Sequence, residues 1–342
     1  MKRLYTVTAL AVVAGFLAGP AHAQSAEEFF KGKTLRMLIG YGPGTGDDLY
    51  ARTLGRHLDR HIPGKPQIVP QNMPGAAGMT MLNHLYNAAP RDGTAIALIR
   101  RNLLAEPLFG TDQAKFEADK FTWLGSMSQE TALCSTWHTS GVKTLDDAKA
   151  REVLVGSTGQ ASGSYQFPVL LNALFGTKFK PLLGYPDSGS IGLAMERGEL
   201  QGYCSFTYGA IKSARPQWLS ENQINVLAQL TTKKHPDLPK VPLIMDLTGD
   251  ALAKQAMTLV FADQEIGRPV AGPPDVPRER VDALKAAFMA TMKDPVFLDD
   301  AKRSGMEIDG PIDGPAVESV LKAIYASPKA AIDKVLAIRD VK

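Results

Sequence analysis

Short apolar runs alternate with amphipathic, helix-period segments along most of the chain. The runs with strand character are residues 35–39, 95–99, 153–155 and 226–230, and the segments with helical period are residues 51–61, 165–175 and 281–292. Strands that alternate with helices are typical of an α/β fold with mainly parallel sheets. In such folds ligands bind at the carboxyl ends of the strands, so we expect a binding site in the segments that follow the apolar runs.

The first 23 residues have the pattern of a secretory signal. Lys2 and Arg3 are followed by an apolar run over residues 4–17 and by an A-x-A site at residues 21–23. The apolar run is too short to span a membrane as a helix. We therefore expect cleavage after the A-x-A site and a periplasmic mature protein that begins at Gln24.

Length and charge narrow the class of protein. Removing residues 1–23 from the 342 leaves 319, which is more than one hydrophobic core usually organises and favours two lobes. The formal net charge of +3 falls to +1, because the removed segment carries Lys2 and Arg3 and no acidic side chain. A net charge so close to zero does not indicate a basic surface that would bind nucleic acid or an anionic membrane. We therefore expect no nucleic-acid partner.

The chain has two cysteines, Cys134 and Cys204, and both fall in segments with strand character. In an exported protein an even count favours a disulfide bond. The alternative is a pair of buried thiols that behave as small apolar residues. We expect the bridge, as a staple of one lobe and not as a catalytic group.

The stretch YGPGTGDDLYAR, residues 41–52, lies between an apolar run and a helix-period segment. A glycine-rich turn in that position directs unpaired N–H groups toward one point, where the helix dipole favours an anion. The spacing does not match G-x-G-x-x-G, since Thr45 or Asp47 occupies the third glycine position, and the only Gly-Lys-Thr, at residues 32–34, precedes the strand. Asp47 and Asp48 would also repel a polyphosphate. The turn therefore indicates a binding site for an anion that is not a nucleotide.

Five more stretches follow this turn: VPQNMPGAAG (69–78), APRDGTAIAL (89–98), VGSTGQASGS (155–164), YPDSGS (185–190) and VAGPPDVPRERVDALKAAFMATMKDPVF (270–297). In this order the series resembles the extracytoplasmic receptors of tripartite tricarboxylate transporters, the Bug family, over almost the whole mature chain. The resemblance implies a type II, flytrap-like periplasmic binding protein. Its two lobes would each be a mainly parallel sheet flanked by helices, with two crossing strands as the hinge. We expect residues 24–124 and 228–342 to form lobe 1, and residues 125–227 to form lobe 2.

The sequence departs from the family pattern in places that bear on the site. Thr45 stands between Gly44 and Gly46, where many members have consecutive glycines, and it adds a methyl and a hydroxyl group at the loop tip. Gln71 and Met73 stand where the second motif usually carries charges, and residues 198–206 also differ.

The resemblance also implies a function. The receptor would capture a small carboxylate between its lobes and deliver it to an integral membrane permease of a tripartite tricarboxylate-type transporter, as a monomer without cofactor or metal. It would not be an enzyme. The alternative is a periplasmic enzyme or sensor subunit that acts on a small carboxylate with the same two-lobed fold, because a fold does not determine a function.

The candidate loops, residues 41–48, 72–78, 156–164 and 185–192, contain no lysine or arginine. Binding of a carboxylate there must rest on backbone N–H groups, hydroxyls and helix dipoles. The candidate ligand contacts in these loops are Tyr41, Gly44, Thr45, Asp48, Gly75, Ala76, Ser157, Thr158, Ser164, Tyr185 and Ser188.

Several candidates have a second interpretation. Asp48 is expected to cap the helix and hold the loop more than to contact the ligand, while Tyr41 and Tyr185 can either line the pocket or pack against the core. Arg101, or its neighbour Arg100, follows a strand and could bind a second carboxylate of a diacid; the alternative is a solvated pair at the lobe edge.

Enzyme signatures are not apparent. His57 and His61 have the i, i+4 spacing of zinc ligands, but HLDRH lacks the glutamate of the metalloprotease motif, so a polar helix face is expected instead. There is no G-x-S-x-G nucleophile motif.

Overall fold

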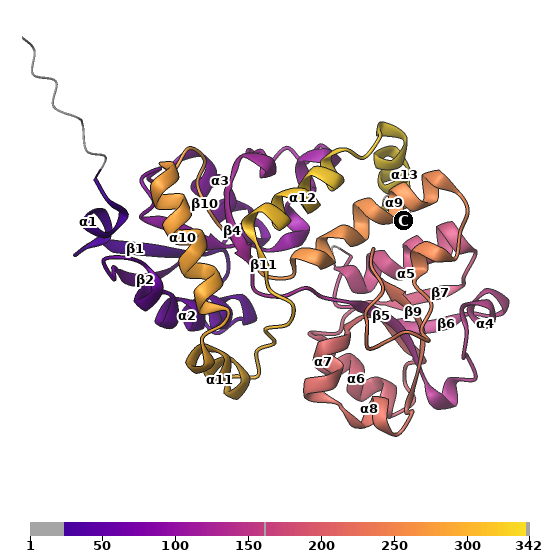
Figure 1. Ribbon diagram of the computed structural model, residues 1–342. Helices are drawn as coiled ribbons and strands as arrows, with labels where there is room; N and C mark the ends of the chain where they lie inside the picture. The colour runs from indigo at the N-terminus through magenta and orange to yellow at the C-terminus, as the bar shows by residue number, and fades with distance from the viewer. Residues whose placement is uncertain (1–23, 161, 340–342) are drawn as a thin grey trace, which may run out of the picture.

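The computed structural model describes residues 24–160 and 162–339, so the expected signal segment lies outside the described residues. Two β-sheets, each flanked by helices, lie side by side and form two lobes (Figure 1). In the described part of the chain no helix is both long enough and apolar enough to cross a membrane.

The sheet of the first lobe has the strand order β11-β4-β10-β3-β1-β2. These strands are β1 (Thr34–Ile39), β2 (Gln67–Asn72), β3 (Ala95–Leu98), β4 (Thr122–Ser126), β10 (Pro269–Gly272) and β11 (Ile312–Asp313). β1 is parallel to β2 and β3, whereas β10 is antiparallel to both of its neighbours, β3 and β4. The sheet is therefore mixed and not mainly parallel as expected, and its parallel half carries the candidate loops.

Helices cover both faces of this sheet (Figure 1). They are α1 (Ala26–Phe30), α2 (Gly46–Leu58), α3 (Met79–Asn87), α10 (Arg278–Thr291), α11 (Pro295–Arg303) and α12 (Gly314–Tyr325). Side chains alternate along β1: Leu35, Met37 and Ile39 pack in one core with residues of α2 and α10, and Leu38 packs in the other core with residues of α3 and α12. Both faces of the strand are buried, which explains why its sequence reads as a continuous apolar run.

The sheet of the second lobe has the order β7-β6-β8-β5-β9. Its strands are β5 (Ala132–Trp137), β6 (Val153–Gly156), β7 (Phe179–Leu182), β8 (Gly202–Thr207) and β9 (Ile224–Leu230). Its helices are α4 (Leu145–Ala150), α5 (Gly163–Phe175), α6 (Ser188–Glu196), α7 (Tyr208–Ala214) and α8 (Gln217–Ser220). β6 is parallel to β7 and β8, while β5 is antiparallel to β8 and β9.

Two helices near the C-terminus contact both lobes. In α9 (Ala251–Phe261), Ala256 and Leu259 belong to a core of the first lobe, whereas Met257 and Phe261 belong to a core of the second. α13 (Lys329–Arg339) packs against α9 and α5. The expected lobe boundary at residue 228 is wrong in detail: it cuts through β9, whose last residues still pair with β5 in the second sheet. It also assigns α9 and α13 to lobe 1, although both pack on the second lobe as well.

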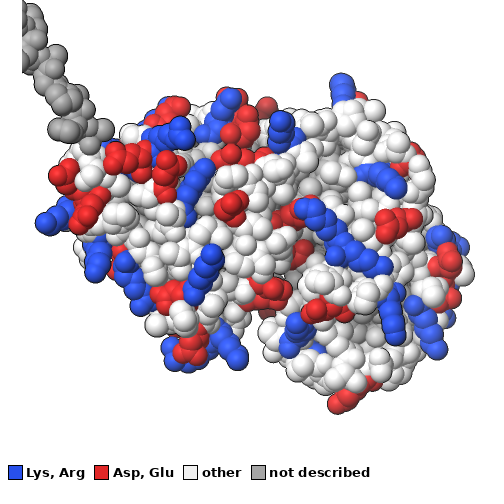
Figure 2. Space-filling view, viewed as in Figure 1, with Lys and Arg blue, Asp and Glu red and all other residues white. Residues whose placement is uncertain are grey.

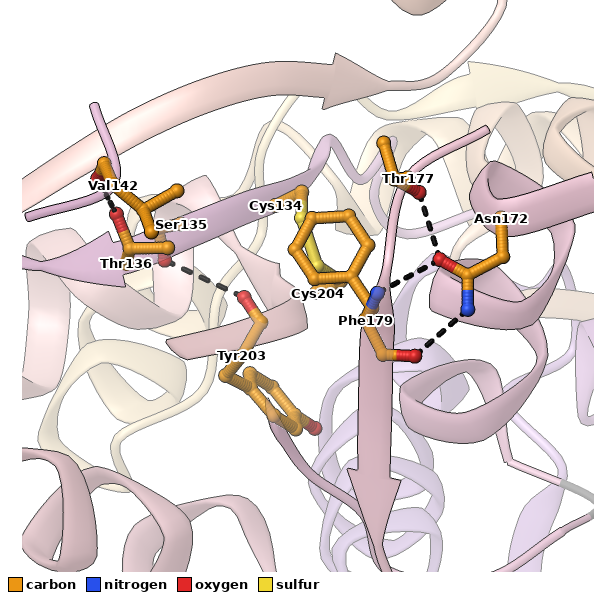
Figure 3. The surroundings of a disulfide bond; sticks show 9 residues. All are labelled: Cys134, Ser135, Thr136, Val142, Asn172, Thr177, Phe179, Tyr203 and Cys204. Atoms are coloured by element: carbon orange, nitrogen blue, oxygen red, sulfur yellow. Dashed lines mark hydrogen bonds between the residues drawn. A yellow bond between two sulfur atoms is a disulfide. The ribbon is translucent and has the colours of Figure 1, made fainter. Parts of the chain in front are cut away.

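A disulfide bond joins Cys134 on β5 to Cys204 on β8, where the two residues lie directly opposite each other (Figure 3). Both residues are fully buried, in the same core as Phe179. The bond closes a loop with a sequence separation of 70 residues. A cross-link of that span stabilises the folded chain by about 4 kcal/mol on the loop-entropy model. It ties the central strand of the second sheet, β8, to its neighbour β5.

Candidate functional site

The topology brings the carboxyl edges of the two sheets to the same place. β4 is parallel to β3, because both are antiparallel to β10, so β4 ends at the edge where β1 and β3 end. From there residues 127–131 lead into β5, whose first residue pairs with Thr207 at the carboxyl end of β8. The loops that follow the parallel strands of both lobes therefore flank one cleft, and the surface is notched between the lobes (Figure 2).

The first candidate loop joins β1 to α2. Gly44 has a left-handed backbone, with φ +83°, and Thr45 is the N-cap of α2, where its hydroxyl accepts from the Asp48 N–H at 3.3 Å. The same hydroxyl donates to the Gly42 carbonyl at 3.0 Å. Gly44 and Thr45 are exposed, and the N–H groups of the first helical turn have no partner within the helix. The loop tip is thus a backbone-built donor site at a helix N-terminus.

Asp48 holds this loop in shape. Its Oδ2 accepts from the Gly44 N–H at 2.9 Å, and its Oδ1 accepts from Arg52 Nε and Asn72 Nδ2, each at 2.8 Å. Asp48 is only 4% exposed. Burial raises the pKa of Asp48, but the hydrogen bonds from Arg52, Asn72 and Gly44 outweigh it and hold the pKa below its ordinary value. With both oxygens occupied, Asp48 fits the loop-holding role that we expected over ligand contact.

The second candidate loop, between β2 and α3, has an unusual backbone. Gly75, Ala76, Ala77 and Gly78 all have positive φ, at 145°, 45°, 55° and 100°. For alanine this region is unfavourable, and such strain is retained mainly where a functional site needs it. The Tyr41 hydroxyl donates to the Ala77 carbonyl, so it ties the second loop to the first. Gly75 and Ala76 are exposed beside that contact.

The two arginines after β3 have different surroundings. Arg101 pairs with Glu130 at 2.7 Å and with Asp263 at 3.6 Å, and its Nη1 donates to the Gly267 carbonyl at 3.2 Å. Its guanidinium is therefore already paired with acidic and carbonyl groups of the segments that connect the lobes. Arg100 is the one near the first loop: it stacks on Tyr41 at 4.6 Å from the ring centroid.

Arg100 also lies 3.5 Å from Asp47, and the other side of Asp47 faces Arg268 at 3.7 Å. Arg268 lies over the Tyr50 ring, 4.7 Å from its centroid, and within 3.8 Å of Glu130. Sequence reasoning missed Arg268 and Glu130. Neither belongs to a glycine-rich motif, and only the pairing of distant segments places them next to the first loop.

In the second lobe, Ser164 is the centre of a hydroxyl cluster at the start of α5. Its Oγ lies 3.3 Å from Ser157 Oγ and 2.5 Å from Ser162 Oγ, and it accepts from the Thr158 N–H at 3.1 Å. Ser157 and Ser164 are buried, whereas Thr158 is exposed. Of these three candidates, Thr158 is therefore the one that a ligand in the cleft can reach, and the two serines shape the loop beneath it.

Tyr185 and Ser188 follow β7, on the loop next to the hydroxyl cluster. The Tyr185 N–H donates to the Ser157 carbonyl at 3.4 Å, and the half-buried Tyr185 side chain packs against the core around α6 and α8. Ser188 is exposed at the start of α6, which Asp187 caps by accepting from the Ser190 N–H at 2.7 Å. The structure thus places the loop candidates of each lobe in one group, and the two groups on facing edges.

Comparison with solved structures identifies the fold. A TctC solute-binding protein from Polaromonas superposes with a TM-score of 0.70 at 20% identity, over 88% of this chain and 98% of that one. The fold is that of a two-lobed solute-binding protein. MatC from Rhodopseudomonas palustris, solved with malate, matches over 90% of this chain and 99% of its own at 16% identity and a TM-score of 0.58. The periplasmic binding protein BugD matches at 16% identity, over 90% and 98% of the two chains, with a TM-score of 0.58.

A comparison with family models matches none, and a comparison with curated proteins matches none. The expected two-lobed α/β fold is nevertheless confirmed, because each of the solved solute-binding proteins is covered over nearly its full length.

In this solute-binding fold two crossing segments, residues 126–131 and 262–268, connect the lobes and are hydrogen-bonded to each other. The Glu130 N–H donates to the Gln264 carbonyl at 2.7 Å, and the Gly267 N–H donates to the Ser128 carbonyl at 2.9 Å. Buried charges lie on this ladder: burial raises the pKa of Asp263 to about 6, although Arg101 opposes the shift.

Glu307 is a second acid near these segments, and it is half-buried. It comes from the loop between α11 and β11, and its carboxyl group fills the space that a Cβ at Gly209 in α7 would need. Its backbone N–H donates to the Tyr50 hydroxyl at 2.8 Å. Burial, followed by the charges of Asp309 and Glu130, raises the pKa of Glu307 to about 7.

We expect these two acids to make the protein less stable as the pH rises toward neutrality. The folded protein holds both protons more tightly than the unfolded chain, so the contribution to stability is complete below the ordinary pKa values of 3.8 and 4.5 and is lost as the pH rises through about 6 and about 7. Urea unfolding between pH 4.5 and 8 measures this slope. Glu307→Gln, which stays uncharged, should flatten it; an unchanged slope in that variant would contradict the assignment to Glu307.

Proposed function

We propose that this protein is an extracytoplasmic receptor of the Bug type. It captures a small carboxylate between its lobes and delivers it to an integral membrane permease of a tripartite tricarboxylate-type transporter. The observation that carries the proposal is the pair of facing loop groups. One offers a helix N-terminus and a left-handed backbone stretch, and the other offers exposed hydroxyls, with no lysine or arginine in either. Backbone N–H groups and hydroxyls in fixed positions suit a carboxylate, because they can point at its two oxygen atoms.

The solved neighbours support the ligand class. MatC was solved with bound malate, and another R. palustris protein, which matches 89% of this chain at 18% identity and a TM-score of 0.58, was solved with adipate. Both of these ligands carry carboxylate groups. The basic start, apolar run and A-x-A site before residue 24 support export to the periplasm, where BugD, by its description, also belongs.

The candidate residues take separate roles in this proposal. The direct contacts are the exposed positions Gly44, Thr45, Gly75, Ala76, Thr158 and Ser188. Tyr41 and Tyr185 form walls of the site, while Asp48, Ser157 and Ser164 hold the loops. Arg100, and not Arg101, is the arginine that a second anionic group would meet.

Ligand capture then works by closure of the two lobes. Lobe 1 is built from residues 24–124 and most of residues 228–342, and lobe 2 from residues 125–227 together with the end of β9 and part of the shared helix α9. The paired crossing segments form the hinge. A ligand that contacts both loop groups stabilises the closed arrangement, and the permease recognises that arrangement. The receptor acts as a monomer, without cofactor or metal and without turnover of its ligand.

A thermal-shift screen of carboxylic acids on the mature protein tests the function. A ligand present at 100 times its dissociation constant should stabilise the fold by about 2.7 kcal/mol. Calorimetry should then give one site per chain, and nuclear magnetic resonance spectra of the ligand should not change with time. Chemical conversion of the ligand would favour the enzyme alternative, and a screen without any stabilising carboxylate would refute the receptor.

A further inference from the structure

The second lobe has a shallow, open depression at the carboxyl end of β7. Its volume is about 480 Å³, and Pro181, Leu182, Leu183, Gly184 and Tyr185 line it. The side chain of Leu183 is 50% exposed, although it is aliphatic and belongs to the edge where ligands bind in α/β folds. An exposed leucine alone is ordinary, but one that lines a depression with a proline, a second leucine and a tyrosine forms an apolar surface.

The depression belongs to the cleft edge and adjoins the hydroxyl cluster. The Ser157 N–H donates to the Leu182 carbonyl at 2.8 Å, and the Tyr185 N–H donates back to the Ser157 carbonyl at 3.4 Å. The lining residues therefore lie alongside the loop that carries Thr158. A ligand whose carboxylate is bound by the loops of the first lobe would direct the rest of its body toward this region.

Charges around the depression do not suit a second carboxylate. Residues 181–186 contain no ionisable group except the tyrosine hydroxyl, and the next residue is the acidic Asp187. The nearby cation Arg215 is already bound: it pairs with Glu196 at 3.3 Å, donates to the Gly189 carbonyl at 3.0 Å, and lies 4.9 Å from the Trp218 ring centroid. Lys180, on β7, pairs with Glu152 at 3.3 Å.

We propose that this depression is a subsite for the apolar body of the ligand, and that the receptor prefers a small monocarboxylate with an aliphatic or aromatic body over a dicarboxylate or tricarboxylate. The inference rests on the proposed receptor function and specifies its ligand class. The expected preference has a simple cause: a carboxylate at the far end of the ligand would lie in this depression and not beside Arg100, which stacks on Tyr41 of the first lobe, so it would lose its water against Leu182 and Leu183 without gaining a cation.

Matched pairs of acids measure the preference by calorimetry. Hexanoate and adipate have the same chain length and differ in one terminal group, as do 4-methylbenzoate and terephthalate. We expect the monoacid of at least one pair to bind tenfold or more tightly than its diacid. A preference for the monoacid below tenfold in both pairs, or a tricarboxylate as the best ligand of the screen, would overturn the subsite and leave the receptor function standing.

A pair of variants locates the effect. Leu183→Asp places a carboxylate in the depression and should weaken binding of the best monoacid at least tenfold, while the exposed position keeps the risk to folding low. Leu193→Asp, at a 47% exposed leucine of α6 in the same lobe, is the control and should bind as the parent does. Equal affinities for the parent and Leu183→Asp would overturn the subsite. If no carboxylate binds the parent at all, the receptor function itself fails.

Discussion

Gly44→Val is expected to weaken carboxylate binding at least tenfold while the protein stays folded. Gly44 has φ +83°, a region that costs an ordinary L-residue about 1–2 kcal/mol and a β-branched residue more. A Cβ at this position would meet open space, so the effect comes from backbone strain and not from a steric clash. The exposed loop can relax to another conformation, which spares the fold but disperses the N–H groups that bind the anion. Because about 1.4 kcal/mol corresponds to a factor of ten, the expected strain alone accounts for this loss.

The control for this variant lies two residues further along. Gly46 also has open space around a built Cβ, but it starts α2 and its φ is not positive, so Gly46→Ala should bind nearly as the parent does. Calorimetry gives the affinities and urea unfolding gives the stabilities. If Gly44→Val binds as tightly as the parent while folded, the turn is only a connector between strand and helix, and the ligand site lies elsewhere.

Asp48→Ala should lower both stability and affinity. The substitution leaves Asn72, Arg52 and the Gly44 N–H without the acceptor that they share. We expect a loss of about 2 kcal/mol in the free energy of unfolding, because these donors are only partly buried and water can solvate some of them. The affinity falls as well, because the carboxylate of Asp48 fixes the left-handed turn at Gly44 and holds the Asn72 side chain that bonds the Tyr41 carbonyl.

Urea unfolding with and without ligand separates the two effects of Asp48→Ala. The matched variant is Asp112→Ala, at an exposed loop aspartate of the same lobe, which should change neither quantity. A stable Asp48→Ala protein with parental affinity would show that the hydrogen-bond network at this loop is dispensable.

The pattern of apolar residues along the chain predicted the strands well, because a buried strand needs apolar side chains at its own positions. The apolar runs at 35–39, 95–99, 153–155 and 226–230 fall in or overlap β1, β3, β6 and β9. The antiparallel insertion of β10 between β3 and β4 was not predicted. A strand's sequence shows that it is buried, but its direction depends on partners that are far away along the chain.

The same limit applies to the site. The backbone features of the first loop could be predicted, since a glycine-rich turn before a helix determines its own geometry. The different surroundings of Arg100 and Arg101 could not be predicted, because Glu130 and Asp263, which bind Arg101, come from two distant segments. Ser157 and Ser164 look like surface residues in the sequence, but their hydroxyls satisfy one another inside the lobe.

In the lobe closure that we propose, helix α9 would be the pivot. Ala256 and Met257 are consecutive residues, yet one belongs to a core of the first lobe and the other to a core of the second. A rigid helix that is shared in this way cannot follow both lobes through a large rotation, so the rotation axis must pass close to it. Displacement grows with distance from an axis. In the first sheet, β1 and β2 lie beyond β3, on the side away from β4 and β10, the strands that adjoin the crossing segments. A small rotation at α9 therefore moves the loops after β1 and β2, which carry Gly44 and Ala76, through the longest arc.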